Sequence, residues 1–240
     1  MRGNSTHKGF TLAEVLVTLG IIGVVSAMTI PSLTQNWQKK SYVTQLHKVY
    51  NVFQQAFWEE INEKQALNLT EAGLTCGAGS NGKEFLHEHF KVVKDCGMNN
   101  SSGCFATSYR SINGRTTNNQ TFWGYNVSIA GGASIAFDNG WGWAGMNPDT
   151  GTLGIIYVDT NGPKGPNISG RDLFVMAVYP DGSLDELNVP VNCRKNGTNC
   201  GSGGSATATR NNYFNNYCKN QTSGYYCFGK ILNDNWEMNY

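Results

Sequence analysis

The residue of this 240-residue chain with the clearest chemistry is Glu14, a carboxylate inside an otherwise apolar run. The run from Phe10 to Ile30 is 21 residues long. As an α-helix it can cross a hydrocarbon core of about 30 Å. A carboxylate in lipid costs at least about 2.5 kcal/mol, so Glu14 needs a cationic partner. The run contains no cation, and the partner must therefore come from outside it.

Cleavage between Gly9 and Phe10 would create such a cation, because Phe10 would then carry a free α-amino group one helical turn from Glu14. Glycine before the bond suits a protease that requires close approach of the backbone. The rival interpretation is an ordinary secretory signal, cut after the small residues 25–27. The charge at Glu14 and the amphipathic helix that follows both favour the first interpretation.

The segment 8–14, Lys-Gly-Phe-Thr-Leu-Ala-Glu, resembles the leader and cleavage site of type IV prepilins and related pseudopilins. The resemblance covers roughly the first 66 residues. It implies that a membrane peptidase removes the leader after Gly9 and N-methylates Phe10. It also implies that Glu14 pairs with the terminal amine of a neighbouring subunit during assembly.

Beyond the apolar run the helical pattern continues, and it predicts one helix from Thr11 to about Ala66 that includes Pro31. Charged and amide residues, Glu60 among them, are expected on its polar surface. An apolar stripe recurs at three- and four-residue steps and must lie against a globular layer. The stripe comprises Val43, Leu46, Val49, Tyr50, Phe53, Phe57 and Ile61.

From Leu67 onward, short runs of β-type residues alternate with turn residues. Strands are expected at 121–129, 133–137, 154–159 and 173–179, with a turn at 180–183 and a strand near Leu184. These features predict an α+β fold in which an antiparallel sheet packs on the helix stripe. Residues 99–103 and 201–209 are expected to be exposed loops, and Trp236 and Tyr240 to pack a last strand. The predicted segments are a leader at 1–9, the assembly helix at 10–66 and a β-rich globular domain at 67–240.

All seven cysteines follow the apolar run, a usage typical of an oxidising compartment. The large domain is therefore expected outside the cytoplasm, on a single-pass precursor in a bacterial inner membrane. The short loops favour pairing Cys193 with Cys200 and Cys218 with Cys227. The early cysteines are Cys76, Cys96 and Cys104, and an odd total leaves one thiol over. No C-x-x-C pair is present, which argues against zinc.

A second group of polar residues lies between Tyr157 and Asp172, a loop that looks like one recurring in pilin-like proteins. Asp159, Asn161, Asn167 and Asp172 could offer oxygen ligands to calcium, which needs six to eight of them. The plainer interpretation is a turn built by hydrogen bonds from side chains to the backbone. We favour the turn, and we expect no resident cofactor.

Two aromatic clusters, residues 122–125 and the pair Trp141 and Trp143, suit either core packing or a sugar-binding surface; core packing is favoured. His87 and His89 are expected to be surface or turn residues. No catalytic motif is present, so an enzyme is not expected. The net charge of +1 becomes −1 when Arg2 and Lys8 leave with the leader, and no nucleic-acid partner is expected.

The sequence therefore predicts a structural subunit of a type IV pilus-like filament or of a type II secretion pseudopilus. It does not separate these two. The expected partners are homologous subunits, the prepilin peptidase, inner-membrane lipid and an assembly motor platform. The final location would be a periplasmic or cell-surface filament. The alternative is a membrane-tethered binding module or adhesin that does not polymerise.

Overall fold

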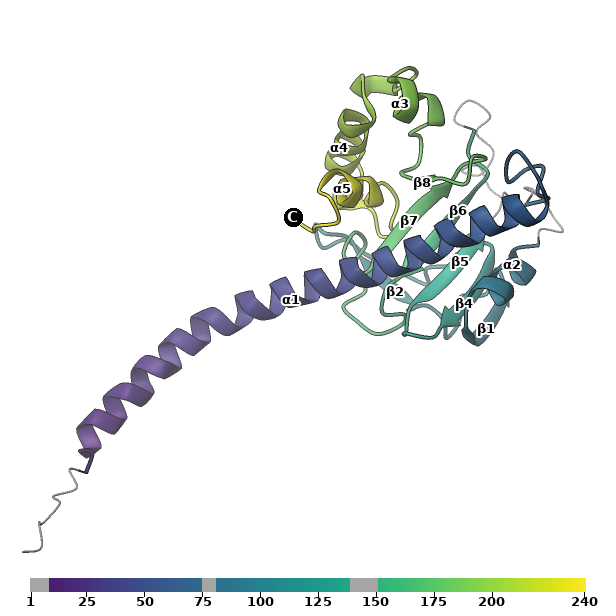
Figure 1. Ribbon diagram of the computed structural model, residues 1–240. Coiled ribbons are helices and arrows are strands. Elements are labelled where there is room, and N and C mark those ends of the chain that lie inside the picture. The colour runs from purple at the N-terminus through teal and green to yellow at the C-terminus, as the bar shows by residue number, and fades with distance from the viewer. Residues whose placement is uncertain (1–8, 75–80, 139–150) are drawn as a thin grey trace, which may run out of the picture. The chain divides into compact units, whose positions relative to one another are not determined.

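The computed structural model describes residues 9–74, 81–138 and 151–240. The chain divides into two compact units, one ending at Lys40 and the other running from Ser41 to Tyr240. Helix α1 spans Leu12–Glu63 (Figure 1), which confirms the long helix expected from the sequence. The second unit begins inside α1 because the apolar stripe of the helix belongs to the globular core.

The first unit is an exposed apolar helix. α1 continues through Pro31 without interruption. Its apolar window is entirely unburied, and by length and composition α1 is the one helix among the described residues that could span a membrane. Exposed apolar surface on this scale needs lipid or protein to cover it.

The second part of α1 packs its apolar stripe into the core of the second unit. The stripe residues are buried, apart from Tyr50, which is half-buried. The helix is also tied to a turn of the sheet, because Gln54 Nε2 donates to the carbonyl of Gly182 at 2.8 Å. The expectation that Glu60 lies on the polar surface is wrong: Glu60 is only 7% exposed, since helix α2 (Gly82–His89) brings His89 next to it.

A six-stranded antiparallel sheet lies against this part of the helix, in the order β1-β4-β5-β6-β7-β8. The fold class expected from the sequence is confirmed. β1 was not predicted, since its residues lack a continuous apolar pattern. The strands are β1 (Val92–Met98), β4 (Tyr125–Ile129), β5 (Ser134–Asp138), β6 (Gly154–Asp159), β7 (Leu173–Val178) and β8 (Leu184–Asp185), and a separate hairpin pairs β2 (Ser108–Arg110) with β3 (Thr116–Asn118).

Both faces of the central strands are buried: successive residues point to opposite sides, and every residue of β5, β6 and β7 is buried. Ile156 and Phe174 face the core that contains the α1 stripe. Tyr157 and Val175 face a second core, which is filled by aromatic residues of the connection between β1 and β4. Burial on both faces explains why the central strands are continuous apolar runs instead of alternating ones.

From Val191 onward the regular elements are all helical, which corrects two expectations. Residues 201–209 are not a loop: they contain the short helix η1 (Gly201–Gly203) and the start of α4 (Ala206–Asn216). The chain end is not a strand either, because α5 (Phe228–Asn233) precedes an irregular tail in which Trp236 stacks on His47. The remaining short helices are α3 (Val191–Asn196) and η2 (Cys218–Asn220).

Two neighbouring acidic residues at the end of β8, Asp185 and Glu186, form hydrogen bonds with helices α4 and α5. Two guanidinium nitrogens of Arg210 donate to the carboxylate of Asp185. Nε lies 2.8 Å from Oδ1, and Nη2 lies 2.5 Å from Oδ2. Glu186 is fully buried and accepts the backbone N–H groups of Leu187 and Gly229. Burial raises the pKa of Glu186 to about 8.

Stability is therefore expected to fall as the pH rises from about 5 to about 9. Between its unfolded pKa of 4.5 and its folded pKa of about 8, Glu186 is protonated in the folded chain and ionised in the unfolded one. The folded state binds more protons, so the free energy of unfolding decreases with pH over this range. Urea unfolding at several pH values measures this slope.

The slope should become shallower in Glu186→Gln, even though that variant loses one backbone hydrogen bond and is less stable at pH 5. Glu63→Gln, at an exposed position, should keep the slope of the original chain. A slope unaffected by Glu186→Gln would show that other groups carry the pH dependence.

Candidate functional site

The N-terminal site consists of Gly9, Phe10, Thr11 and Glu14. Gly9 and Phe10 precede the helix, and the Phe10 side chain is 89% exposed. The peptide bond between them is therefore accessible to a protease. Glu14 lies in the first turn of α1, where a negative charge interacts favourably with the helix dipole.

Thr11 and Glu14 form a reciprocal cap at the start of α1. The backbone N–H and the hydroxyl of Thr11 both lie 2.9 Å from Glu14 Oε2, and the N–H of Glu14 donates to Thr11 Oγ1 at 3.3 Å. This is the capping box, in which two unpaired donors of the first turn are satisfied. Thr11 was not among the site residues predicted from the sequence, although the pattern Thr-x-x-Glu at 11–14 predicts a capping box.

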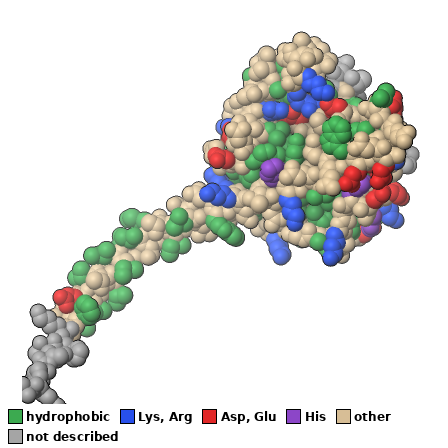
Figure 2. Space-filling view, viewed as in Figure 1, with side chains coloured by type: hydrophobic (Ala, Val, Ile, Leu, Met, Phe, Trp, Pro, Cys, Tyr) green, Lys and Arg blue, Asp and Glu red, His purple; other side chains and the backbone are tan. Residues whose placement is uncertain are grey.

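The helix beyond this cap offers a continuous apolar surface. Apolar side chains lie all along its N-terminal half (Figure 2). Leu16, Val17 and Leu19 are about 60% exposed, and the other large apolar residues of this stretch are also exposed. The N-terminal half of α1 can insert into lipid or pack in a bundle of similar helices. Glu14 is its one carboxylate and lies at its start.

The loop from Asp159 to Asp172 brings its two aspartates into the protein interior. Tyr109 donates its hydroxyl to Asp159 Oδ2 at 2.5 Å, and the N–H of Asn161 donates to Oδ1 at 3.2 Å. Asp172 accepts the N–H groups of Asn167 at 2.7 Å and Ile168 at 2.6 Å, one on each oxygen. All four carboxylate oxygens therefore accept hydrogen bonds from the protein.

The amides of the same loop are used differently. Asn161 Nδ2 donates to the carbonyls of Lys164 and Gly165 at 2.7 and 3.0 Å. The side-chain oxygens of Asn161 and Asn167 are buried and have no partner within the described residues. These two oxygens, with the two carboxylates, are the groups that could hold a cation.

The protonation of both aspartates is shifted by their surroundings. Burial raises the pKa of Asp172 to about 6, against the opposing effect of its backbone donors. Burial and the nearby charge of Asp172 raise the pKa of Asp159 well above its usual value. The donor from Tyr109 partly offsets this effect, so Tyr109 matters for keeping Asp159 in the core.

Three disulfides crosslink the described residues: Cys96–Cys104, Cys193–Cys200 and Cys218–Cys227. The two late pairs are those that the short spacings favoured. Cys76 lies outside the described residues. Gly170 packs against the third bridge, since a Cβ there would lie 3.0 Å from Cys227 Sγ.

The candidate aromatic and histidine residues differ in how exposed they are. Trp141 and Trp143 lie outside the described residues. Phe122 and Tyr125 are buried, whereas Trp123 is 55% exposed. His87 is exposed and 3.1 Å from Asp95, as expected of a surface residue.

The expectation for His89 was wrong, because its side chain is only 11% exposed. It lies between two glutamates of α1, with Nδ1 at 3.3 Å from Glu59 and Nε2 at 3.5 Å from Glu60. Glu60, Glu88 and His89 have ligand atoms within 4.8 Å of one another. Lys64 already pairs with Glu60, so the group is adequately explained as an ion-pair cluster.

Comparison with known proteins defines the class of the N-terminal site. Residues 4–30 match the prokaryotic N-terminal methylation motif. The N-terminal segment therefore carries the type of methylation motif expected from the sequence. The motif and the apolar helix fit a membrane-anchored precursor.

A relative extends this similarity beyond the motif. The chain is 36% identical over 77 residues to the prepilin peptidase-dependent protein D of Escherichia coli (strain K12). The aligned region covers 32% of this chain and 47% of that protein, so the chain spans about half the length of the curated relative. No solved structure matches the chain.

Replacement of Tyr109 by phenylalanine is expected to lower the free energy of unfolding by about 1–3 kcal/mol, the cost of an unsatisfied buried polar group. The change removes the hydroxyl that donates to Asp159 and leaves the N–H of Ala106 without its acceptor. Chemical denaturation measures the loss. Tyr217→Phe, at a residue 47% exposed, is the matched control and should change stability little. Equal effects of the two variants would contradict the role assigned to Tyr109.

Proposed function

We propose that this chain is a subunit of a type IV pilus-like filament or a type II secretion pseudopilus. It is cleaved after Gly9, N-methylated at Phe10 and polymerised through α1. The observation that carries the proposal is an unburied apolar helix that begins with an exposed cleavage site and a single acid. The methylation motif at residues 4–30 supports the processing step.

The role of Glu14 in assembly follows from electrostatics. A charge in an apolar medium is costly when unpaired, and cleavage exposes an α-amino group at Phe10. Subunits whose helices bundle in register bring this ammonium near the Glu14 of a neighbour. The bonds from Thr11 hold the carboxylate at the helix start until that partner arrives.

Assembly moves the apolar half of α1 from lipid into an equally apolar bundle. Little hydrophobic free energy is gained in such a transfer, because lipid tails are as apolar as the side chains of the bundle. Extraction from the membrane therefore needs external work, and we expect an assembly motor platform in the inner membrane to supply it. The other partners are the prepilin peptidase and homologous subunits, and the chain itself has a structural role.

A membrane-tethered binding module that never polymerises is the second candidate. The exposed Trp123 on the globular unit favours it, because an adhesin presents aromatic side chains to its ligand. Both candidates share the anchor. They differ only in whether the protein enters fibres.

For the loop 159–172 we propose a structural turn without a resident calcium ion. The support is that each carboxylate oxygen already accepts a hydrogen bond and that Asn161 closes the turn through two carbonyls. A calcium ion would have to displace or share these donors.

Replacement of Glu14 by alanine is expected to leave cleavage after Gly9 intact and to block entry into filaments. Without Glu14 the α-ammonium of the neighbour stays unpaired in the apolar bundle at a cost of at least about 2.5 kcal/mol, which should reduce filament-associated protein on the order of 50-fold or more. Mass spectrometry of the mature terminus reports processing, with methyl-Phe10 expected. Immunodetection in sheared fibres reports assembly.

Two variants sharpen this test. Glu14→Gln keeps an acceptor for Thr11 but removes the charge, so it should also fail to assemble. Thr18→Ala, whose hydroxyl only caps the carbonyl of Val15, should assemble normally. Normal assembly of Glu14→Ala would refute the charge-pairing role, and absence of the original chain from fibres would favour the tethered module.

Calcium chloride in place of EGTA is expected to leave the thermal midpoint of the chain unchanged. A ligand that binds only the folded state at 100 times its Kd adds about 2.7 kcal/mol of stability, which a melting curve readily detects. Calorimetry with and without calcium checks the prediction. A calcium-dependent rise that disappears in Asn161→Ala would instead establish a cation site in the loop.

A further inference from the structure

A polar cavity of about 220 Å³ lies between the β1–β2 connection and the segment that follows β3. A water molecule occupies about 30 Å³ of liquid, so the cavity has room for several waters or one compact polar ligand. Its ten lining residues belong to residues 99–107 and 119–121. No element of the N-terminal unit contributes to it.

The lining has an unusual composition. Eight of the ten residues carry a carboxamide or a hydroxyl, and none of these described residues carries a charge. The side chains of Asn119, Gln120 and Thr121 have no hydrogen-bond partner within the described part of the chain. Carboxamides both donate and accept, so they are suited to a ligand with many neutral hydroxyls.

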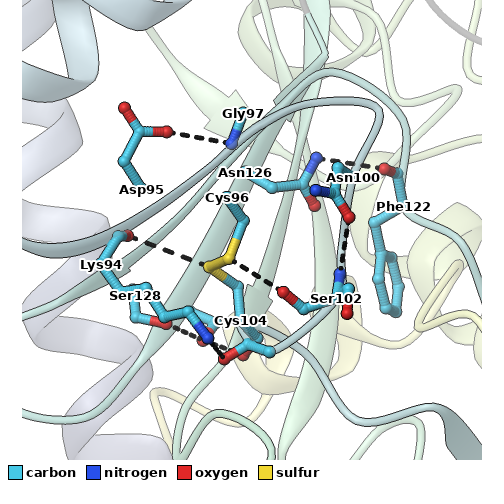
Figure 3. Close-up of a disulfide and its surroundings, with 12 residues drawn as sticks. Lys94, Asp95, Cys96, Gly97, Asn100, Ser102, Cys104, Phe122, Asn126 and Ser128 are labelled. Atoms are coloured by element: carbon cyan, nitrogen blue, oxygen red, sulfur yellow. Dashed lines mark hydrogen bonds between the residues drawn. A yellow bond between two sulfur atoms is a disulfide. The ribbon is translucent and has the colours of Figure 1, made fainter.

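One wall of the cavity is held in place covalently. The disulfide Cys96–Cys104 closes the loop that carries Asn100 and Ser102, and the N–H of Ser102 donates to Asn100 Oδ1 at 3.1 Å (Figure 3). The N–H groups of Cys104 and Phe105 both donate to the carbonyl of Ser101. The loop is therefore ordered before any ligand arrives, which lowers the entropic cost of binding.

The same wall is bonded to the turn that carries Trp123. The N–H of Phe122 donates to Ser101 Oγ at 3.0 Å, and the N–H of Gly124 donates to Asn99 Oδ1 at 2.8 Å. Trp123 thus lies between two residues that bond directly to the cavity wall, and its side chain is 55% exposed. Trp123 is not one of the lining residues, but the bonds of its two neighbours place its backbone beside the cavity wall.

The turn itself is rigid. Buried Asn126 donates to the carbonyls of Phe122 and Gly124 at 3.2 and 2.8 Å. Gly124 has φ +88°, and a Cβ there would lie 2.2 Å from the carbonyl oxygen of Phe137, so no other residue fits. An exposed tryptophan on a fixed turn offers contact area at little conformational cost.

The cavity lies on the side of the sheet opposite the packed part of α1. Phe105 and Phe122 pack on the sheet face that carries Tyr157 and Val175. The stripe of α1 packs on the opposite face, with Ile156 and Phe174. A ligand at the cavity would therefore meet no obstruction from the packed part of α1.

We propose that this cavity, together with the adjacent Trp123, is a binding site for a neutral carbohydrate. Carboxamides and hydroxyls would bond the sugar hydroxyls, and the indole would cover the apolar face of a sugar ring. A charged ligand would require an opposite charge that the lining lacks. The proposal does not depend on polymerisation, because the site lies wholly in the globular unit.

The test is saturation-transfer NMR on the full chain in a detergent without a sugar headgroup, with chitotriose, maltotriose and lactose as separate probes. Transfer to at least one of them is expected at millimolar concentration. Trp123→Ala should weaken binding roughly tenfold or more, as for a buried aromatic anchor. Gln120→Ala should also weaken it, because Gln120 is a free hydrogen-bonding group of the lining.

Trp58→Ala is the matched control, since Trp58 is also 55% exposed but belongs to α1. It should bind as the original chain does, and all variants should keep the original melting temperature. Absence of transfer to all three sugars would overturn the proposal, and so would binding that survives both Trp123→Ala and Gln120→Ala. Binding of sialyllactose alone would show that the site requires a charge. Entry into sheared fibres, scored on the same variants, should be unchanged.

Discussion

The structure depends on burial of the α1 stripe against one face of an antiparallel sheet. Phe53 and Phe57 are fully buried there and contact Phe85 of helix α2. This contact joins an otherwise unburied apolar helix to a folded unit. The same α-helix thus has an exposed part and a buried part. The boundary lies at Lys40, after which buried positions begin.

Since α1 covers only one face of the sheet, the other face needs a cover of its own. The long connection between β1 and β4 supplies it through Phe105, Tyr109 and Phe122. A disulfide pins that connection, and its outer surface carries the amide-lined cavity. The two faces of the sheet therefore have different covers: the stripe of α1 on one and this connection on the other.

Three buried acidic side chains in the described part of the molecule are each surrounded by hydrogen-bond donors. Asp159 and Asp172 each accept from two donors, and Glu186 accepts two backbone N–H groups. The pKa values of all three acids are raised, because burial still disfavours their charged forms. Glu14 is exposed, and at the helix start it also accepts hydrogen bonds, from Thr11.

Local pattern alone determined the long helix, the N-terminal methylation motif and the four central strands, because these features depend on neighbouring residues. Tertiary contacts decided the rest. Glu60 is buried because α2 folds over it. Helices α4 and α5 lack a clear apolar pattern, and they are held in place by bonds to Asp185 and Glu186. The cavity is invisible in the sequence, since residues 99–107 and 119–121 meet only after the connection folds onto the sheet.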